Sequence, residues 1–191
     1  MKSRVQKLVA KAQKGDRSAF GQLVSQYQEK LLYLGYDLMG NWEDARDAAQ
    51  NSFVKAFEKL PAFEGRAHFS TWLYRIMVNQ CRDLQRKNSR ARMDYYENDG
   101  LELAAENQLA SSKTGENVMQ KLENTELRFQ LEQAMQQLSI NQRTAISLRF
   151  FHEYSTTEIA EIMTCSENTV RIHMFRGLNK LKEILPKMNI N

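Results

Sequence analysis

Apolar residues recur every three or four positions through most of this chain, and this helical spacing constrains its fold more than any other feature. Proline, which interrupts helices, occurs only at Pro61 and Pro186. Alternating runs of β-branched residues, the usual sign of strands, are almost absent from the sequence. Together these observations predict an all-α protein.

The apolar pattern divides the chain into two small helical domains. Residues 1–92 form the first, in which Asp16 follows Gly15 and is placed to cap a long amphipathic helix. Residues 93–122 are acidic and keep no sustained apolar face, so we expect a flexible, solvated linker there. Residues 123–191 return to helical spacing and form the second domain, which ends in a helix-turn-helix pattern.

The composition narrows the class of protein. A hydrophobic content of 42% is enough for real cores, and a formal net charge of +4 is a mild basic bias. No apolar run is long enough to span a membrane, and residues 1–20 lack the apolar core of a secretory signal. Cys81 and Cys165 lie far apart in apolar helical patterns, without the spacing of metal ligands. We therefore expect a reduced, cytoplasmic protein with no metal and no cofactor.

One helix of the first domain carries a basic stripe opposite its apolar side. At about 100° per residue, four polar residues within 71–87 gather on one side, at spacings of four, three and four: Arg75, Asn79, Arg82 and Arg86. Guanidinium groups in a row match the phosphates of a nucleic-acid strand, and an amide among them can read a base edge. An ordinary solvated face would produce the same stripe.

Aromatic residues beside this helix favour the nucleic-acid interpretation. The loop before the helix and the first turns of the helix carry four rings and a glycine: Phe63, Gly65, Phe69, Trp72 and Tyr74. Rings of this kind stack on unpaired bases. The stripe and the rings together predict binding to nucleic acid whose strands are at least partly open.

Residues 154–185 have the local signals of a helix-turn-helix motif. Ser155 and Glu158 make a capping box for a first helix, and Ser166 is placed to cap the second. The turn begins with Thr164, where many such motifs have glycine. A helical hairpin that merely packs is the alternative to this interpretation.

The second helix of such a motif reads duplex DNA, because side chains near its start reach base edges in the major groove. The candidate duplex-reading residues are Ser166, Asn168, Thr169, Arg171, Ile172, His173, Phe175 and Arg176. We expect His173 to lie beside a phosphate or a base rather than to bind a metal, since no His or Cys stands at a useful spacing from it.

Taken in order along the chain, these patterns resemble the extracytoplasmic-function (ECF) group of bacterial sigma-70 factors, the promoter-specificity subunits of RNA polymerase. The resemblance covers nearly the whole chain except the linker. Four segments carry it: Gly15, Asp16, Ala19 and Phe20; Asp44, Asp47, Gln50, Phe53 and Ala56; Phe63, Gly65, Phe69, Thr71, Trp72, Leu73, Ile76 and Asn79; and Ser155, Glu158, Ile159, Ala160, Thr169, Val170, Arg171 and Arg176. Each segment alone is moderately specific, whereas four in the right order and at the right separations are strongly so.

The resemblance implies that the chain binds bacterial core RNA polymerase and promoter DNA, and that an anti-sigma factor, often membrane-anchored, holds it inactive. It implies no small-molecule substrate and no enzyme activity in this chain, since the polymerase performs the chemistry. The aromatic loop and the basic stripe would open and read the −10 element, and the helix-turn-helix would read the −35 element. Polymerase would bind one helix face, opposite the apolar stripe of Phe53 and Phe57. The residues of that polymerase-binding face are Asp44, Asp47, Gln50 and Asn51.

Two departures limit what the resemblance transfers. The family often has an acidic residue where this chain has Asn51, so charge complementarity is not carried over at that contact. Ile172 and His173 occupy positions that tune sequence preference, so no particular −35 sequence follows.

Two other classes of function stay open on the sequence alone. A stand-alone helix-turn-helix regulator would bind duplex DNA tightly without polymerase, but it would leave residues 63–92 without a purpose. A nucleic-acid enzyme would use Asp44, Asp47 and Asp83 as metal ligands, although no His, Glu or Lys converges with them in the sequence. Metal-dependent nuclease activity would indicate the second class.

Overall fold

The computed structural model describes residues 3–99 and 125–188, and within these ranges the chain is helical with no strand. The helices follow one another as α1 Arg4–Gln13, α2 Arg17–Met39, α3 Trp42–Lys59, α4 Phe69–Asp99, α5 Thr125–Gln136, α6 Ile140–Phe150, α7 Thr156–Met163 and α8 Glu167–Ile184. Short 3-10 turns follow α3 at Leu60–Ala62 and α8 at Leu185–Met188. The prediction of an all-α fold is confirmed.

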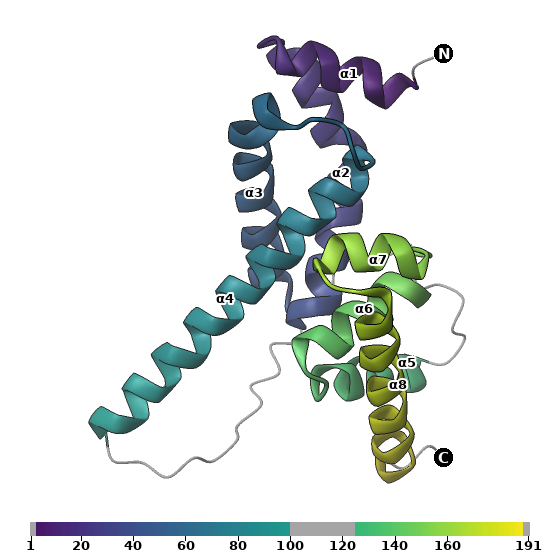
Figure 1. The fold of residues 1–191 in the computed structure, drawn as a ribbon. Coiled ribbons are helices and arrows are strands. Elements are labelled where there is room, and N and C mark those ends of the chain that lie inside the picture. The colour runs from purple at the N-terminus through teal and green to yellow at the C-terminus, as the bar shows by residue number, and fades with distance from the viewer. Residues whose placement is uncertain (1–2, 100–124, 189–191) are drawn as a thin grey trace.

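The helices form two groups (Figure 1). Helices α1–α4 make the first group, in which α4 extends well beyond its neighbours, and α5–α8 make the second. Most of the predicted linker, residues 93–122, lies outside the described residues, but its beginning continues α4 as helix to Asp99. Adding a residue to an existing helix costs far less than starting one, and no glycine intervenes before Gly100. The predicted domain boundaries stay predictions.

Side-chain caps begin the helices where the sequence predicted them. Asp16 accepts a hydrogen bond from the backbone amide three residues further on, at 3.0 Å. Ser155 and Glu158 form the predicted capping box of α7. Ser166 caps α8 in the same way at 3.1 Å. Each cap satisfies backbone donors that the first turn of a helix leaves without partners.

The turn between α7 and α8 shows how the motif tolerates a residue other than glycine. Thr164 has φ 56° and ψ 51°, the left-handed conformation that ends α7. Glycine adopts this conformation freely, whereas a residue with a Cβ is strained there by about 1–2 kcal/mol. The Cys165 amide donates to the Ala160 carbonyl at 3.0 Å, and this bond closes the turn. The helix-turn-helix geometry is therefore kept at a small local cost.

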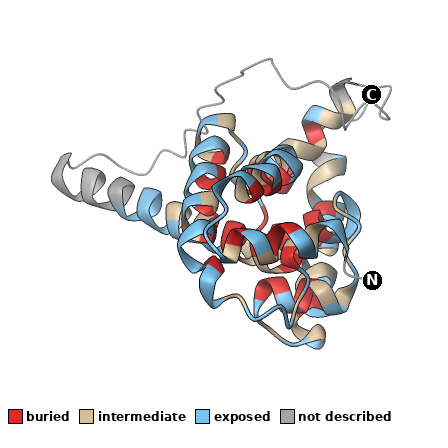
Figure 2. Cartoon of the chain, turned by 90° about the horizontal axis from the view of Figure 1, so that it is seen from above, coloured by how far each residue is buried: buried red, intermediate tan, exposed pale blue. Residues whose placement is uncertain are grey.

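The core of the first group is built around α2. Buried leucines line one side of that helix: Leu23, Leu31, Leu34 and Leu38. Where α2 meets α3, a Cβ on Gly35 would stand 3.1 Å from the Cα of Ala45, so the glycine permits the close approach of the two helices. Figure 2 shows the buried residues gathered where helices meet. Cys81 belongs to this interior, and burial raises the pKa of its thiol to about 12.

The two groups of helices also pack on each other, α7 against α4 and α6 against α2; this contact is called the seam below. The ring of Tyr74 lies 5.0 Å from that of Tyr154 and 5.9 Å from that of His152, between centroids. Across the same seam Asp37 pairs with His152, at 3.0 Å between Oδ2 and Nε2. Burial raises the pKa of Asp37, and the hydrogen bond with His152 opposes that rise. The predicted domains are thus joined by a continuous interior.

A buried arginine ties the groups together. Arg143 of α6 is 3% exposed, and its guanidinium donates to the carbonyls of Leu38 at 2.5 Å, Gln136 at 2.8 Å and Leu138 at 3.1 Å. These carbonyls lie at or just beyond the ends of α2 and α5, where helices leave acceptors unpaired and carry partial negative charge. Burial lowers the pKa of Arg143 to about 10, so the side chain stays charged at neutral pH. Two helix ends therefore stabilise one buried cation.

Replacing Arg143 with Met is expected to lower the free energy of unfolding by about 2–4 kcal/mol. Methionine fills part of the volume but leaves buried carbonyls without donors, and each such group costs about 1–3 kcal/mol. Urea unfolding followed by circular dichroism measures the change. The control is Arg46→Met on the exposed side of α3, which should shift the value by less than about 0.5 kcal/mol. Equal effects of the two substitutions would contradict the role given to Arg143.

Candidate nucleic-acid interface

The predicted basic stripe lies along α4, on the side that meets the second group of helices. Arg75 is half-buried, and its Nε donates to the carbonyl of Glu161 in α7 at 2.9 Å. Arg82 is also half-buried, and burial lowers its pKa. Asn79 and Arg86 are exposed, and Arg86 pairs with a neighbouring aspartate of α4 at 2.6 Å. Seam contacts thus occupy part of the stripe and leave the rest open to solvent.

The loop rings form one aromatic cluster at the start of α4. The ring of Phe63 lies 4.8 Å from that of Trp72 and 6.1 Å from that of Phe69. Phe63 and Trp72 are half-buried, whereas Phe69 is 6% exposed and packs on Tyr27. Gly65 turns the loop with a φ of 73°, a conformation that residues with a Cβ rarely adopt. Phe63 and Trp72 therefore offer ring surface, and Phe69 supports them.

Tyr74 does not belong to this cluster, and its interpretation as a base-stacking residue is wrong. It is 2% exposed and lies in the seam. Two residues along a helix turn by about 200°, so Tyr74 points away from Trp72. Its ring packs the two groups of helices together.

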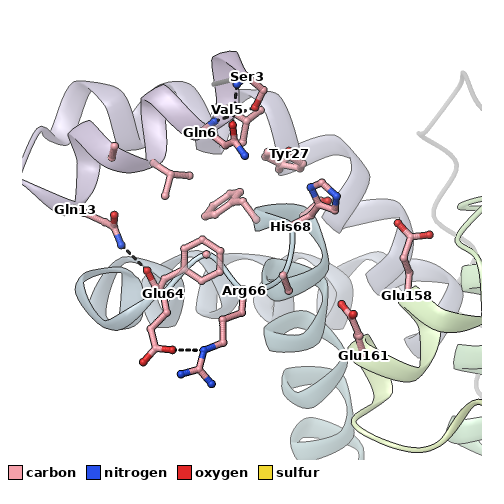
Figure 3. A pocket seen from close by; sticks show the side chains of 17 residues that line it. Ser3, Val5, Gln6, Gln13, Tyr27, Glu64, Arg66, His68, Glu158 and Glu161 are labelled. Atoms are coloured by element: carbon pink, nitrogen blue, oxygen red, sulfur yellow. Dashed lines mark hydrogen bonds and ion pairs between the residues drawn. The ribbon is translucent and has the colours of Figure 1, made fainter. Parts of the chain in front are cut away.

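A cavity of about 860 Å³ opens beside the aromatic cluster (Figure 3). Its walls come from α1, from residues 63–70 of the loop and the start of α4, and from Tyr27 of α2. Glu158 and Glu161 of α7 line it from across the seam. The sequence did not predict these contributions of α1, Tyr27 and α7, because no local pattern connects segments so far apart in the chain.

Helices α7 and α8 form the predicted helix-turn-helix. On α8, Val170, Gly177 and Leu181 are buried. The opposite side is open to solvent, with Phe175 67% and Ile172 40% exposed. The exposed residues among those predicted to read duplex DNA are Ser166, Asn168, Arg171, Ile172, Phe175 and Arg176.

Several of the predicted duplex-reading side chains have partners within the chain. The Oγ of Ser166 caps α8 and lies 2.8 Å from the Oγ1 of Thr169. Arg171 pairs with Glu167 on the surface at 2.9 Å. Burial lowers the pKa of His173, and neighbouring arginines add to this effect, so the ring is neutral at pH 7. Arg176 is thus better placed than His173 to bring positive charge to DNA.

The predicted polymerase-binding residues lie together near the start of α3. Asp47, Gln50 and Asn51 are exposed. Asp44 is half-buried and accepts a hydrogen bond at 3.0 Å from Asn41, the residue that caps α3. Three of the four side chains are therefore freely accessible.

The predicted apolar stripe on the other side of α3 is only partly right. Phe53 packs against the core, but Phe57 is 44% exposed and meets Phe20 edge-on at 5.0 Å. Both rings of that pair lie near helix ends, at the rim of the bundle, where neighbouring helices cover them incompletely. Val54, 57% exposed, adds a further apolar side chain to the surface of α3.

Among the residues that the structure describes, no three His, Cys, Asp or Glu side chains are grouped to hold a metal ion. Asp44 instead bonds the cap of α3, and Asp83 pairs with Arg86 on α4. Within the same described ranges, none of the helices has the length and apolar character needed to cross a membrane.

Comparison with known sequences connects both groups of helices with one family. Residues 23–91 match the family model of sigma-70 region 2, and residues 128–181 match that of sigma-70 region 4. The RNA polymerase sigma-H factor of Pseudomonas aeruginosa is 35% identical over 187 residues, covering 94% of this chain and 93% of that protein. The ECF RNA polymerase sigma factor SigW of Bacillus subtilis is 32% identical over 191 residues, covering 97% and 98%. This chain belongs to the ECF sigma-factor family.

Solved structures of sigma factors have a similar fold. CnrH, in complex with the cytosolic domain of CnrY, matches with a TM-score of 0.66 and 24% identity over 94% of this chain and 96% of that one. The sigma factor RpoE of Bartonella quintana, in complex with the anti-sigma factor NepR, matches with a TM-score of 0.65 and 25% identity, covering 87% and 96%.

Membership of this family decides between the functions that the sequence left open. ECF sigma factors are regulatory subunits that direct RNA polymerase to promoters, so this sigma factor serves promoter-specific transcription rather than acting as a stand-alone regulator. The region 2 match contains the aromatic loop and the basic stripe, and the region 4 match contains α7 and most of α8. Helix α1 lies outside both matched segments.

Proposed function

We propose that this sigma factor divides promoter recognition among three surfaces and works in the cytoplasm beside core polymerase. The outer face of α3 binds the polymerase, the exposed side of α8 reads the −35 duplex, and the aromatic loop with the α4 stripe holds the melted −10 strand. No covalent step belongs to this chain. The observation that carries the proposal is the cavity that Phe63 lines, because a cavity beside a partly exposed ring suits an unpaired base; Trp72 packs on Phe63 at 4.8 Å.

The −10 surface combines stacking with charge. Phe63 offers ring surface to the cavity and Trp72 packs on Phe63, while α4 continues away from the cavity with its arginines. Asn79 is the one member of the stripe that both donates and accepts hydrogen bonds, and its side chain is exposed. We assign base reading to Asn79 and phosphate binding to Arg75, Arg82 and Arg86.

The −35 surface depends on the exposed residues of α8. Arg176 is exposed and suits a bidentate contact with guanine. Asn168, Ile172 and Phe175 share its solvent-exposed side. Ser166 contributes mainly by capping α8, and its hydroxyl bonds that of Thr169.

The closed seam is incompatible with this mode of DNA binding, so we propose that the two groups separate on the polymerase. The guanidinium of Arg75 is occupied by the Glu161 carbonyl, and two carboxylates of α7 line the −10 cavity. Thr169 and His173 of α8 line a second cavity, of about 490 Å³, together with Arg82. The chain between α4 and α5, residues 100–124, would span up to about 80 Å if extended, which permits wide separation.

An anti-sigma factor is a further proposed partner. The related RpoE was solved with its anti-sigma factor NepR. On this chain Ile172, Phe175 and Leu178 leave apolar surface exposed along α8, which suits a protein partner as well as DNA. Membrane anchoring of that partner stays an expectation from the family resemblance.

Polymerase binding through α3 is tested by the double variant Asp47→Lys, Gln50→Ala. Both side chains are exposed, so their loss should leave the helical content unchanged. Capture of purified core polymerase and run-off transcription from a genomic library are expected to fall at least tenfold, as expected when about 1.4 kcal/mol of binding energy is lost. Asn51→Ala is the matched control and should have the smaller effect. Normal capture by the folded double variant would overturn the assignment of this face, and silence of the wild-type holoenzyme on every template would overturn the proposed function.

Base reading by Asn79 is tested by Asn79→Ala. The variant should bind polymerase and −35 duplex normally but form fewer open complexes at cognate −10 sequences, because it loses the group that selects the base. Permanganate reactivity of unpaired thymines measures opening at cognate and altered promoters. If Asn79→Ala opens cognate and altered promoters as the wild type does, Asn79 reads no base and its side chain is simply solvated.

We propose above that the closed seam covers part of the basic stripe on α4. Tyr154→Ala tests this, because it removes the ring that packs on Tyr74 across the seam. The free chain is expected to expand in small-angle X-ray scattering and to bind single-stranded −10 DNA more tightly than the wild type. Phe150→Ala, at a side chain 56% exposed on α6, is the control and should do neither. An expanded Tyr154→Ala chain whose strand affinity equals that of the wild type would show that the seam covers nothing needed for binding.

A further inference from the structure

The loop beside the −10 cavity is held by a residue far from it in sequence. Gln13 is the last residue of α1, and its Nε2 donates to the carbonyl of Leu60 at 3.1 Å and to that of Phe63 at 2.7 Å. An amide nitrogen carries two hydrogens, so this side chain uses both of its donors on the start of the loop. Figure 3 shows Gln13 reaching toward the loop from α1.

Gln13 is itself rigidly placed. Directly after it the chain turns at Gly15, whose amide donates to the Ala12 carbonyl at 3.0 Å and whose φ is 91°. The next amide, of Asp16, donates to the Lys11 carbonyl at 3.2 Å, and the Asp16 side chain then caps α2. The end of α1, which carries Gln13, is therefore fixed to the start of α2.

The rest of the loop is anchored where it joins α4 and is open to solvent around Gly65. Phe69 is buried where α4 begins. Around Gly65 an added Cβ would meet nothing within 4 Å, and Glu64 and Arg66 pair on the surface at 2.6 Å. At the near end of the loop, the Phe63 amide donates to the Leu60 carbonyl at 3.0 Å, and the two hydrogen bonds from Gln13 add a link from α1 to the same carbonyl and to that of Phe63. The Gln13 bonds thus help to fix the Phe63 backbone, from which its ring packs on Trp72.

We propose that Gln13 is a positioning residue for promoter opening: it holds Phe63 where its ring can capture an unpaired base. A loop that is ordered before binding loses less conformational entropy when the base arrives. The inference rests on the proposed function of the loop, and Gln13 lies outside both segments that match the sigma-70 family models.

The tether itself is tested without DNA or polymerase. The chain has two tryptophans, Trp42 and Trp72, so 5-fluorotryptophan gives two ¹⁹F resonances in the whole chain. Gln13→Ala should shift or broaden the Trp72 resonance, because Phe63 packs on that ring at 4.8 Å. The Trp42 resonance should stay in place, because that ring stacks on Tyr36 instead, at 4.2 Å.

Opening is then measured with reconstituted holoenzyme on duplex promoters and on promoters with a pre-melted −10 region. Gln13→Ala is expected to reduce open complexes on duplex about tenfold, a factor consistent with the net loss of one to two hydrogen bonds. The loss should be smaller on the pre-melted template, where opening has already occurred, and capture of core polymerase should not change. Gln13→Glu keeps the size of the side chain but turns a carboxylate toward two carbonyls, so it should lose more than the alanine variant.

The matched control is Gln22→Ala. Gln22 is an exposed glutamine of α2 that does not line the cavity. Near-normal opening by Gln22→Ala beside a defect in Gln13→Ala supports the inference. Equal opening by both variants, or an unchanged Trp72 resonance in Gln13→Ala, overturns it. Wild-type holoenzyme that opens no promoter would instead overturn the proposed function, and the fluorine spectra would still decide whether Gln13 tethers the loop.

Discussion

The buried guanidinium of Arg143 determines how the two groups of helices meet. Its acceptors are backbone carbonyls at the ends of α2 and α5, and buried carbonyls need donors wherever the chain places them. Meeting that need brings α6 onto α2, and α7 then packs on α4. The contacts of Tyr74 and the pair of Asp37 with His152 follow from this placement. Arg143 thus holds α6 against α2, and the contact of Tyr74 with Tyr154 holds the rest of the seam together.

In the same seam, the arginines proposed to bind DNA lack partners for some of their hydrogen-bond donors. Arg75 finds a single carbonyl, and among the described residues the buried Nε of Arg82 has no hydrogen-bond partner. Unpaired buried donors cost free energy, whereas phosphates would supply acceptors for both arginines. Asp47 and Gln50 stay exposed in the closed arrangement. In the proposed mechanism polymerase therefore docks first, and promoter DNA then competes for surfaces that the seam holds weakly.

Much of the fold and part of the candidate site were predictable from sequence. Capping by Asp16, Ser155 and Ser166 depends on residues within one turn, so the sequence predicted these helix starts correctly. The predictions were wrong for residues whose placement depends on burial by distant helices. Tyr74 was grouped with the loop rings because it is close in sequence, and Phe57 was placed in the core because its spacing is helical. Their surroundings depend on which helices pack nearby, and spacing along the chain does not contain that information.

By itself, then, the sequence determined the helices, their caps, the helix-turn-helix and the chemistry of the α4 stripe, because each depends on side chains a few positions apart. Only the tertiary structure decided which surfaces these features face. Gln13 reaches the loop 47 and 50 positions away, Arg75 meets α7 across 86 positions, and Asp37 meets His152 across 115. No local pattern specifies such pairs, because they form only when packing satisfies buried polar groups from distant parts of the chain.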